Sequence, residues 1–377
     1  MQELKLHYIS QCFAQRIAEY KNCCKAYLWF IKVVHMTRRH ISLKDMALEL
    51  KVAVSTVSRA LKNHPDISPE VTAKVQALAR EWHYSPNPLA MGLLKQQTKT
   101  IGVIVPDLVT HFYSSIISGI EQVAKDNGYY IIIASSYESY EKEKECIDNL
   151  LMSRVEGLIV CLAQETSDYS HYNTIIENEM PLVFFDRVCL TDKVPAVVND
   201  NRDAARQLTI HLFEGGARKI AHIAGPQHLN IAMERLYGYR DGMRECGFTP
   251  DDEVIAYTNL STDEATEATR QLLTQQIRPD AILSVNDTVA FAVMKEIKRQ
   301  GLKIPDDVSL VGFTDEFHAT VVDPSLTSVM HPTLEMGQEA ARLLLRQSKF
   351  GEKPIAVQLV LKTKMVVRDS SVKRQKR

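Results

Sequence analysis

Four polar residues at helical spacing, Ser55, Thr56, Ser58 and Arg59, have side chains suited to contacting nucleic acid. Small hydroxyl groups form hydrogen bonds with phosphates and base edges, and an arginine donates paired hydrogen bonds to a base in the major groove. The apolar residues among them recur at the period of a helix, which leaves these four side chains free to face outward. The segment therefore predicts a helix whose outer face reads double-stranded DNA.

The flanking sequence predicts two more helices that would position this one. Ser42 can cap a helix that precedes it, and Lys51-Val52-Ala53 leaves room only for a tight turn. A third helix is expected after Ser68, where serine caps and Pro69 takes the first turn. This is helix-turn-helix spacing, although a small packing bundle without a role in DNA binding has the same pattern.

Local charge favours the DNA interpretation. Between Met36 and Lys99 the sequence carries ten Lys or Arg residues against five Asp or Glu, whereas the whole chain has a formal charge of -1. A basic excess confined to a helix-turn-helix is the electrostatic pattern that phosphate contacts require.

The composition of the chain excludes several classes of protein, among them membrane-spanning and disulfide-rich secreted proteins. The length of 377 residues predicts two or three domains, and a hydrophobic content of 45% is ample for buried cores. The seven cysteines form neither a C-x-x-C pair nor a disulfide framework, so we expect reduced thiols and no metal site. No apolar run reaches the roughly 20 residues of a membrane span, and no signal peptide is evident. We therefore expect a cytoplasmic protein.

After residue 100, short β-branched runs alternate with amphipathic helices. This βαβ order occurs twice and predicts two mostly parallel, doubly wound sheets with a ligand cleft beyond the carboxyl ends of the strands. The sequence contains no dinucleotide fingerprint, Walker loop, zinc-protease helix or G-x-S-x-G elbow. We accordingly expect binding without catalysis, and no cofactor.

Three ordered motifs, VSTVSRALKNHPDIS, HYSPNPLAMGL and TIGVIVPDL, resemble the lactose/galactose repressor (LacI/GalR) family of bacterial transcription regulators. The likeness extends from about Ile41 to Ser370. It implies an N-terminal all-α helix-turn-helix domain followed by a periplasmic-binding-protein-like effector domain of two α/β lobes. It also implies a homodimer on a near-palindromic operator, in a protein associated with the bacterial nucleoid.

The resemblance and the helix pattern together define a DNA-binding set. In the segment between the domains, Asn87 can cap a short helix, and the residue aligned with Leu93 inserts into the minor groove of the operator. A plain linker whose leucines pack on the body is the alternative. The predicted DNA contacts are Ser42, Val54, Ser55, Thr56, Ser58, Arg59, Asn63, Asn87, Leu89, Ala90 and Leu93.

The resemblance also implies an effector site. Arg235 aligns with the arginine that binds effector oxygens, and Asp287 with a carboxylate that accepts from ligand hydroxyls or amines, although Asp287 could equally cap the following helix. Phe112 and Tyr113 offer aromatic faces to a sugar ring, although core packing would explain them as well. The predicted set is Phe112, Tyr113, Asp186, Arg235, Asn286, Asp287 and Asp315. Purine-responsive relatives have an arginine where this chain has Leu229, which favours a carbohydrate.

These patterns predict the following domain boundaries. We expect a non-family extension over 1–35, a helix-turn-helix domain over 36–84, a hinge over 85–98, a first lobe over 99–198 and 328–349, a second lobe over 199–327 and 350–370, and a basic tail over 371–377. For the extension, we consider either a translation start at Met36 or an extra helix that covers a partner.

The predicted function is a transcription regulator whose operator affinity depends on a small effector, in particular a sugar or sugar derivative. A sugar-binding receptor without DNA function is the alternative binding class.

Overall fold

A computed structural model describes residues 41–84, 98–350 and 356–372. The chain divides into two compact units, with the boundary between Gln96 and Gln97. The predicted hinge residues Asn87, Leu89, Ala90 and Leu93, and the 1–35 extension, lie outside the described residues. None of the described helices combines the length and the apolar composition that a bilayer crossing requires.

The N-terminal unit contains three short helices: α2 (Leu43–Leu50), α3 (Val54–Leu61) and α4 (Pro69–Glu81). Their inner faces meet in a core that includes Met46, Val57 and Val75. Ser42 and Asp45 form a reciprocal capping box at the start of α2, and Lys51 ends that helix with a left-handed φ of 53°. The helix-turn-helix prediction is confirmed.

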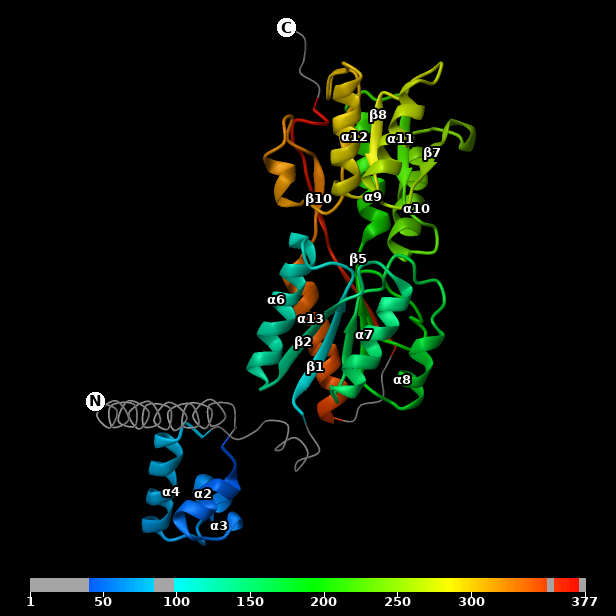
Figure 1. Cartoon of the computed structure of the whole chain (residues 1–377). Helices are drawn as coiled ribbons and strands as arrows, with labels where there is room; N and C mark the ends of the chain where they lie inside the picture. Colours follow the sequence, from blue (N-terminus) through cyan, green and yellow to red (C-terminus); the bar gives the residue numbers. More distant parts are fainter. Residues whose placement is uncertain (1–40, 85–97, 351–355, 373–377) are drawn as a thin grey trace, which may run out of the picture. The chain divides into compact units, whose positions relative to one another are not determined.

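The C-terminal unit contains two lobes, each with a sheet between helices (Figure 1). The first sheet has the strand order β11-β5-β4-β3-β1-β2 and the second β7-β6-β8-β9, and all pairs within them are parallel. The first-lobe elements in chain order are β1 (Thr100–Val105), α6 (His111–Asp126), β2 (Tyr130–Ser135), α7 (Tyr140–Met152), β3 (Leu158–Val160), η1 (Ser170–Tyr172), α8 (Asn173–Glu177), β4 (Leu182–Phe185), β5 (Ala196–Asn199), α13 (Thr333–Phe350) and β11 (Gln358–Leu361). Those of the second lobe are α9 (Asn201–Glu214), β6 (Ile220–Ala224), α10 (Asn230–Glu245), η2 (Pro250–Asp252), β7 (Val254–Tyr257), α11 (Thr262–Leu273), β8 (Ala281–Ser284), α12 (Asp287–Arg299), β9 (Ser309–Val311) and η3 (Phe317–Thr320).

Alternating residues of each strand contact opposite helical layers. In β1, Ile101, Val103 and Val105 pack against α6 and α13, whereas Ile104 packs against α7 and the residues near α8. The second sheet is covered in the same way, by α11 and α12 on one face and by α9 and α10 on the other. Burial on both faces explains why the strands read as continuous apolar runs. The predicted fold class is confirmed.

Three crossovers join the lobes. The chain passes from β5 into α9, from β10 (Ser328–Met330) into α13, and from β11 into β12 (Lys364–Val366), which pairs antiparallel with β10. We had expected the whole of 350–370 in the second lobe. However, β11 pairs with β5 in the first sheet, where its apolar residues Leu359, Val360 and Leu361 extend that sheet at an edge, so the third crossover follows Leu361.

The close packing of α6 on α13 depends on Gly119 and Gly337. A methyl group at Gly337 would overlap the Ile116 carbonyl oxygen, which belongs to the backbone and cannot move aside easily. We therefore expect Gly337→Ala to lower the free energy of unfolding by about 2 kcal/mol. Urea denaturation should show this loss, whereas Ser118→Ala, on the exposed side of α6, should leave stability nearly unchanged. Equal stability of the two variants would contradict this packing role.

Candidate functional site

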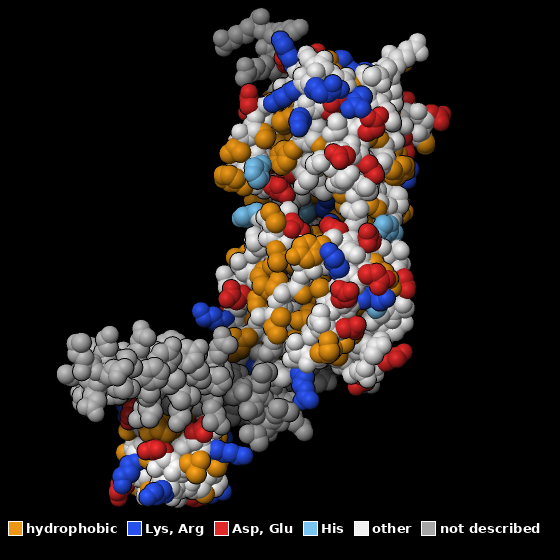
Figure 2. Space-filling model, in the orientation of Figure 1, with side chains coloured by type: hydrophobic (Ala, Val, Ile, Leu, Met, Phe, Trp, Pro, Cys, Tyr) orange, Lys and Arg blue, Asp and Glu red, His pale blue; other side chains and the backbone are white. Residues whose placement is uncertain are grey.

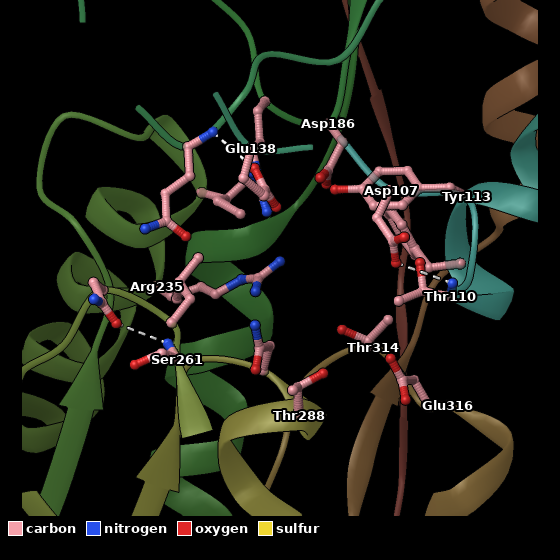
Figure 3. A pocket seen from close by; sticks show the side chains of 17 residues that line it. Asp107, Thr110, Tyr113, Glu138, Asp186, Arg235, Ser261, Thr288, Thr314 and Glu316 are labelled. Carbon is pink, nitrogen blue, oxygen red and sulfur yellow. Dashed lines mark hydrogen bonds and ion pairs between the residues drawn. The ribbon is translucent and has the colours of Figure 1, made fainter. Parts of the chain in front are cut away.

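A cavity of about 390 Å³ lies between the lobes, at the carboxyl ends of both sheets (Figure 3). The loops after β1, β2, β3 and β4 form one wall, and the loops after β7, β8 and β9 together with α10 form the other. The lining residues are Asp107, Thr110, Phe112, Tyr113, Glu138, Gln164, Asp186, Arg187, Ile231, Arg235, Asn259, Leu260, Ser261, Asn286, Thr288, Thr314 and Glu316. This volume falls in the range of small-molecule sites.

On the first-lobe wall, Glu138 and Arg187 form an ion pair with an Oε2–Nη1 distance of 2.6 Å. The same Glu138 oxygen accepts a hydrogen bond from the backbone N–H of Gln164 at 2.8 Å. These contacts fix three loops relative to one another, because each residue follows a different strand. Arg187 Nε is buried without a hydrogen-bond partner among the described residues.

Asp186 is the buried carboxylate of this wall. It is 4% exposed, and its backbone is left-handed with a φ of 56°. Its Oδ1 atom has no hydrogen-bond partner among the described residues, and the same holds for Thr110 Oγ1. Burial raises the pKa of Asp186, although the charges of Arg235 and Arg187 oppose this effect. Buried polar atoms without partners are costly, so both atoms indicate a place where ligand hydroxyls or amines can bind.

Arg235 projects from the second lobe toward this carboxylate wall (Figure 3). Its Nε donates to Asn201 Oδ1 at 3.0 Å and its Nη1 donates to the Val285 carbonyl at 2.7 Å. The guanidinium also lies 4.0 Å from the ring centre of Phe313. Burial lowers the pKa of Arg235 to about 10, so the group stays charged at neutral pH. Among the described residues, no hydrogen bond uses Nη2, which is therefore available to a ligand oxygen.

Two further carboxylates face each other across the cavity. Asp107 and Thr110 of the first lobe lie opposite Thr314 and Glu316 of the second (Figure 3). Asp107 accepts hydrogen bonds from the backbone N–H groups of Val109 and Thr110, at 3.0 and 3.2 Å. Burial raises the pKa of Glu316.

The predicted aromatic pair lies at the first-lobe edge of the cavity. Phe112 and Tyr113 both line it, and their rings meet edge to face with centroids 5.1 Å apart. Phe112 also contacts the ring of His331 edge to face at 5.6 Å. Because Tyr113 is 6% exposed and belongs to the first-lobe core, this residue both packs in the core and lines the cavity.

The structure places two predicted effector contacts outside the cavity lining. Asp287 is fully buried, where its carboxylate accepts from Ser328 Oγ at 2.6 Å and from the backbone N–H of Glu316 at 2.8 Å. Asp315 instead forms an ion pair with Arg368 at 2.6 Å. Both carboxylates therefore hold the loop after β9, on which Thr314 and Glu316 reach the cavity.

Asn286, rather than Asp287, caps α12. Its Oδ1 accepts from the backbone N–H of Val289 at 2.8 Å, and the residue also lines the cavity. Of the seven predicted effector residues, the structure thus brings five together: Phe112, Tyr113, Asp186, Arg235 and Asn286.

Sequence reasoning missed most of the lining. The additional polar residues share one property, which is that each follows the end of a parallel strand or begins the next helix. They are Asp107, Thr110, Glu138, Gln164, Arg187, Asn259, Ser261, Thr288, Thr314 and Glu316. In parallel sheets the ligand site lies beyond the carboxyl ends of the strands, so the polar residues that follow every predicted strand were candidates for this lining.

In the N-terminal unit, the outer face of α3 carries the predicted DNA contacts. Ser55 and Arg59 are exposed, Thr56 and Ser58 are half-buried, and Val54 is 40% exposed. Arg59 lies 3.9 Å from Asp66, and both side chains are more than half exposed. Such a pair contributes little stability, so it leaves the guanidinium accessible to DNA.

Two other predicted DNA contacts have partners within the unit. Asn63 has a φ of 56°, and its Oδ1 accepts from Gln76 Nε2 of α4 at 2.7 Å. The Ser42 hydroxyl is engaged in the capping box with Asp45. Asn63 is thus oriented by α4, and Ser42 acts first as a helix cap.

Comparison with known proteins decides the family. Residues 42–87 match the model of bacterial regulatory proteins of the lacI family, and residues 98–363 match that of periplasmic binding proteins and the sugar-binding domain of the LacI family. The chain belongs to the LacI family. The chain is a DNA-binding transcription regulator rather than an enzyme, because members of this family regulate transcription.

Individual relatives agree with this assignment. The transcriptional repressor CytR of Escherichia coli is 34% identical over 306 residues, which cover 81% of this chain and 89% of the relative. Catabolite control protein A of Priestia megaterium is 31% identical over 81% of this chain and 92% of its own length. The lac repressor dimer bound to its operator and an anti-inducer superposes with a TM-score of 0.77 at 27% identity, over 89% of this chain and 100% of the other. The regulator CelR in complex with cellobiose gives a TM-score of 0.67 at 29% identity, over 88% and 99%.

Proposed function

We propose that this LacI-family regulator binds near-palindromic operator DNA as a cytoplasmic, nucleoid-associated homodimer, and that an unphosphorylated sugar or sugar derivative in the interlobe cavity controls its affinity. The exposed face of α3 supports the DNA part, through Ser55, Thr56, Ser58 and Arg59. The lac repressor dimer bound to its operator supports the same assembly.

The charge of the cavity lining is the main support for an unphosphorylated sugar as the effector. Four carboxylates, Asp107, Glu138, Asp186 and Glu316, face two guanidinium groups, and one carboxylate is already paired with Arg187. Asp186 Oδ1 and Thr110 Oγ1 both lack hydrogen-bond partners in the described part of the chain. A ligand rich in hydroxyl donors would satisfy these acceptors, whereas a phosphate group would meet a net negative surface. The cellobiose complex of CelR is consistent with this chemistry.

The edge strand β2 offers a surface for the second copy. Tyr130, Ile132 and Ile133 of β2 are 73%, 39% and 41% exposed. In the described sheet β2 is the last strand, so it pairs only with β1. Figure 2 shows hydrophobic side chains gathered over this lobe. Exposed apolar residues on an edge strand favour association. The inner face of α13 is not exposed for this role, because it packs against α6 within the same lobe.

One experiment tests the DNA and effector assignments together. Duplexes selected from random sequence by the purified chain are expected to share a near-palindrome and to bind more weakly as salt rises. The affinity for the selected duplex is then measured with D-ribose, D-glucose, cellobiose and the phosphate esters of the two monosaccharides. An effect of an unphosphorylated member supports the proposal. Absence of any salt-sensitive enrichment would favour the sugar receptor without DNA function, and preference for an ester would reject the effector class.

We expect Arg59→Ala to weaken binding to the selected duplex about tenfold, because a bidentate base contact contributes about 1–3 kcal/mol. Discrimination between the selected and a random duplex should fall by a similar factor. Fluorescence anisotropy of labelled duplexes measures both. Arg80→Ala, which removes an arginine from α4, is the matched control and should reduce affinity for the two duplexes equally. Unchanged specificity in Arg59→Ala would remove Arg59 from the base-reading set.

A further inference from the structure

Two side chains of the second lobe, those of Asn230 and His228, form hydrogen bonds with the backbone of the first lobe. Asn230, the first residue of α10, accepts a hydrogen bond from the backbone N–H of Val188 at 2.9 Å and donates one to the carbonyl of Asp186 at 3.0 Å. Both partners belong to the loop after β4. The neighbouring His228 donates from Nε2 to the Gln164 carbonyl in the loop after β3, at 2.6 Å.

These contacts are concentrated in a single short segment. Among the described residues, and apart from the three crossovers, the hydrogen bonds that join the lobes all come from residues 228–230. No such bond joins Asp107 to Glu316 on the other side of the cavity, where the two walls face each other (Figure 3). The cleft is thus fastened along one rim, and the opposite rim has no direct tie.

The fastening acts on a strained residue of the cavity. Asp186 has a left-handed backbone, with a φ of 56°, which costs free energy for a residue with a side chain. Two bonds hold its peptide groups: its N–H donates to the Val197 carbonyl at 2.9 Å within the first lobe, and its carbonyl accepts from Asn230 of the second. The carbonyl is therefore fixed only while the lobes are in contact. The orientation of this backbone also decides where the Asp186 carboxylate lies.

We propose that Asn230, aided by His228, is an interlobe clasp that holds the cleft partly closed without effector and positions the Asp186 carboxylate for binding. The effector would then encounter a pocket of which one wall is set by the other lobe, and opening would occur mainly at the rim of Asp107 and Glu316. The consequence for the effector rests on the proposed function, but the clasp itself does not.

The amide of Val188 reports on the clasp directly, because its acceptor is the Asn230 side chain. In hydrogen–deuterium exchange of the full-length, effector-free protein, Asn230→Ala should accelerate exchange at Val188 about tenfold, as expected for loss of a partly buried hydrogen bond. His228→Ala should accelerate it about threefold. The amides of Leu158 and Phe184, whose bonds lie within the first sheet, should keep their wild-type rates, which separates local release from general destabilisation.

Asn178→Ala is the matched control, because among the described residues the Asn178 side chain forms its hydrogen bond with Thr174 of the first lobe, so its loss should leave exchange at Val188 unchanged. Small-angle scattering of the same samples should show a larger radius of gyration for Asn230→Ala than for this control. Wild-type exchange at Val188 in Asn230→Ala would overturn the proposal. If that variant does not fold, His228→Ala decides, and wild-type exchange at Val188 would then overturn it. Neither measurement uses DNA or effector, so failure here is distinct from failure of the proposed function.

Discussion

Replacing Arg235 with lysine is expected to weaken effector binding about 100-fold while the fold survives. The guanidinium donates to Asn201 and to the Val285 carbonyl, lies on the ring of Phe313, and keeps Nη2 for the ligand. A lysine ammonium cannot make these planar contacts together, and a buried charge with incomplete partners costs about 3 kcal/mol. Because burial already lowers the pKa of Arg235 to about 10, a lysine there would lose its charge more readily.

Calorimetric titration with the active unphosphorylated sugar, as identified by the duplex-binding panel, measures this effect. Arg244→Lys is the control on the same helix, because the Arg244 side chain is 76% exposed and its ion pair with Asp241 lies on the surface. Its affinity for the sugar should equal that of the wild type. Effector affinity in Arg235→Lys within about threefold of the wild type would exclude Arg235 from the binding set.

The elements that carry a strong local signal could be predicted from sequence. The three short helices have apolar residues at helical spacing and serine caps at Ser42 and Ser68, and both caps form in the structure. The buried parallel strands read as apolar runs because both of their faces are covered. In each case the sequence signal, whether a cap, a helical period or an apolar run, lies within a few consecutive residues, so the local pattern is sufficient to predict the element.

The loop after β9 shows why the site was predicted less completely. Asp287 and Asp315 have the residue type of an effector ligand, but each meets a partner from a distant part of the chain, Ser328 and Arg368 respectively. Only the three-dimensional structure shows that these partners consume the carboxylates. Thr314 and Glu316, which flank Asp315, reach the cavity instead. Neighbouring residues of an irregular loop point in different directions, and a loop has no sequence period from which the direction of each side chain could be predicted.

The pairing of the edge strand β11 could not be predicted from the sequence either. β11 joins the first sheet beside β5, so its location depends on a register between segments about 160 residues apart. The short apolar run in Gln358–Leu361 is compatible with either sheet. What decides the lobe is the free edge of β5, a property of the assembled sheet that a local pattern does not contain.

Asp287 allows a direct test of its structural role, because its carboxylate is fully buried and accepts two hydrogen bonds, so its ionisation should affect the stability of the fold. Burial outweighs these bonds and raises the pKa of Asp287 to about 6, above the value of 3.8 for an exposed group. The folded state therefore binds a proton that the unfolded state releases, so this group favours folding below about pH 4 and the contribution disappears as the pH rises to about 6. By linkage the loss is on the order of 3 kcal/mol.

Asp287→Asn cannot ionise, so its free energy of unfolding should fall less between pH 4 and pH 7 than that of the wild type, by on the order of 3 kcal/mol. At pH 4 the variant should be close to the wild type in stability, because its amide can donate to the Ser328 hydroxyl and accept from the Glu316 N–H, as the protonated carboxyl does. Urea denaturation followed by circular dichroism measures both terms, with Asp251→Asn as the control at an exposed acid. Parallel pH profiles for the wild type and Asp287→Asn would show that Asp287 ionises at an ordinary pH, and hence that its two hydrogen bonds compensate fully for burial.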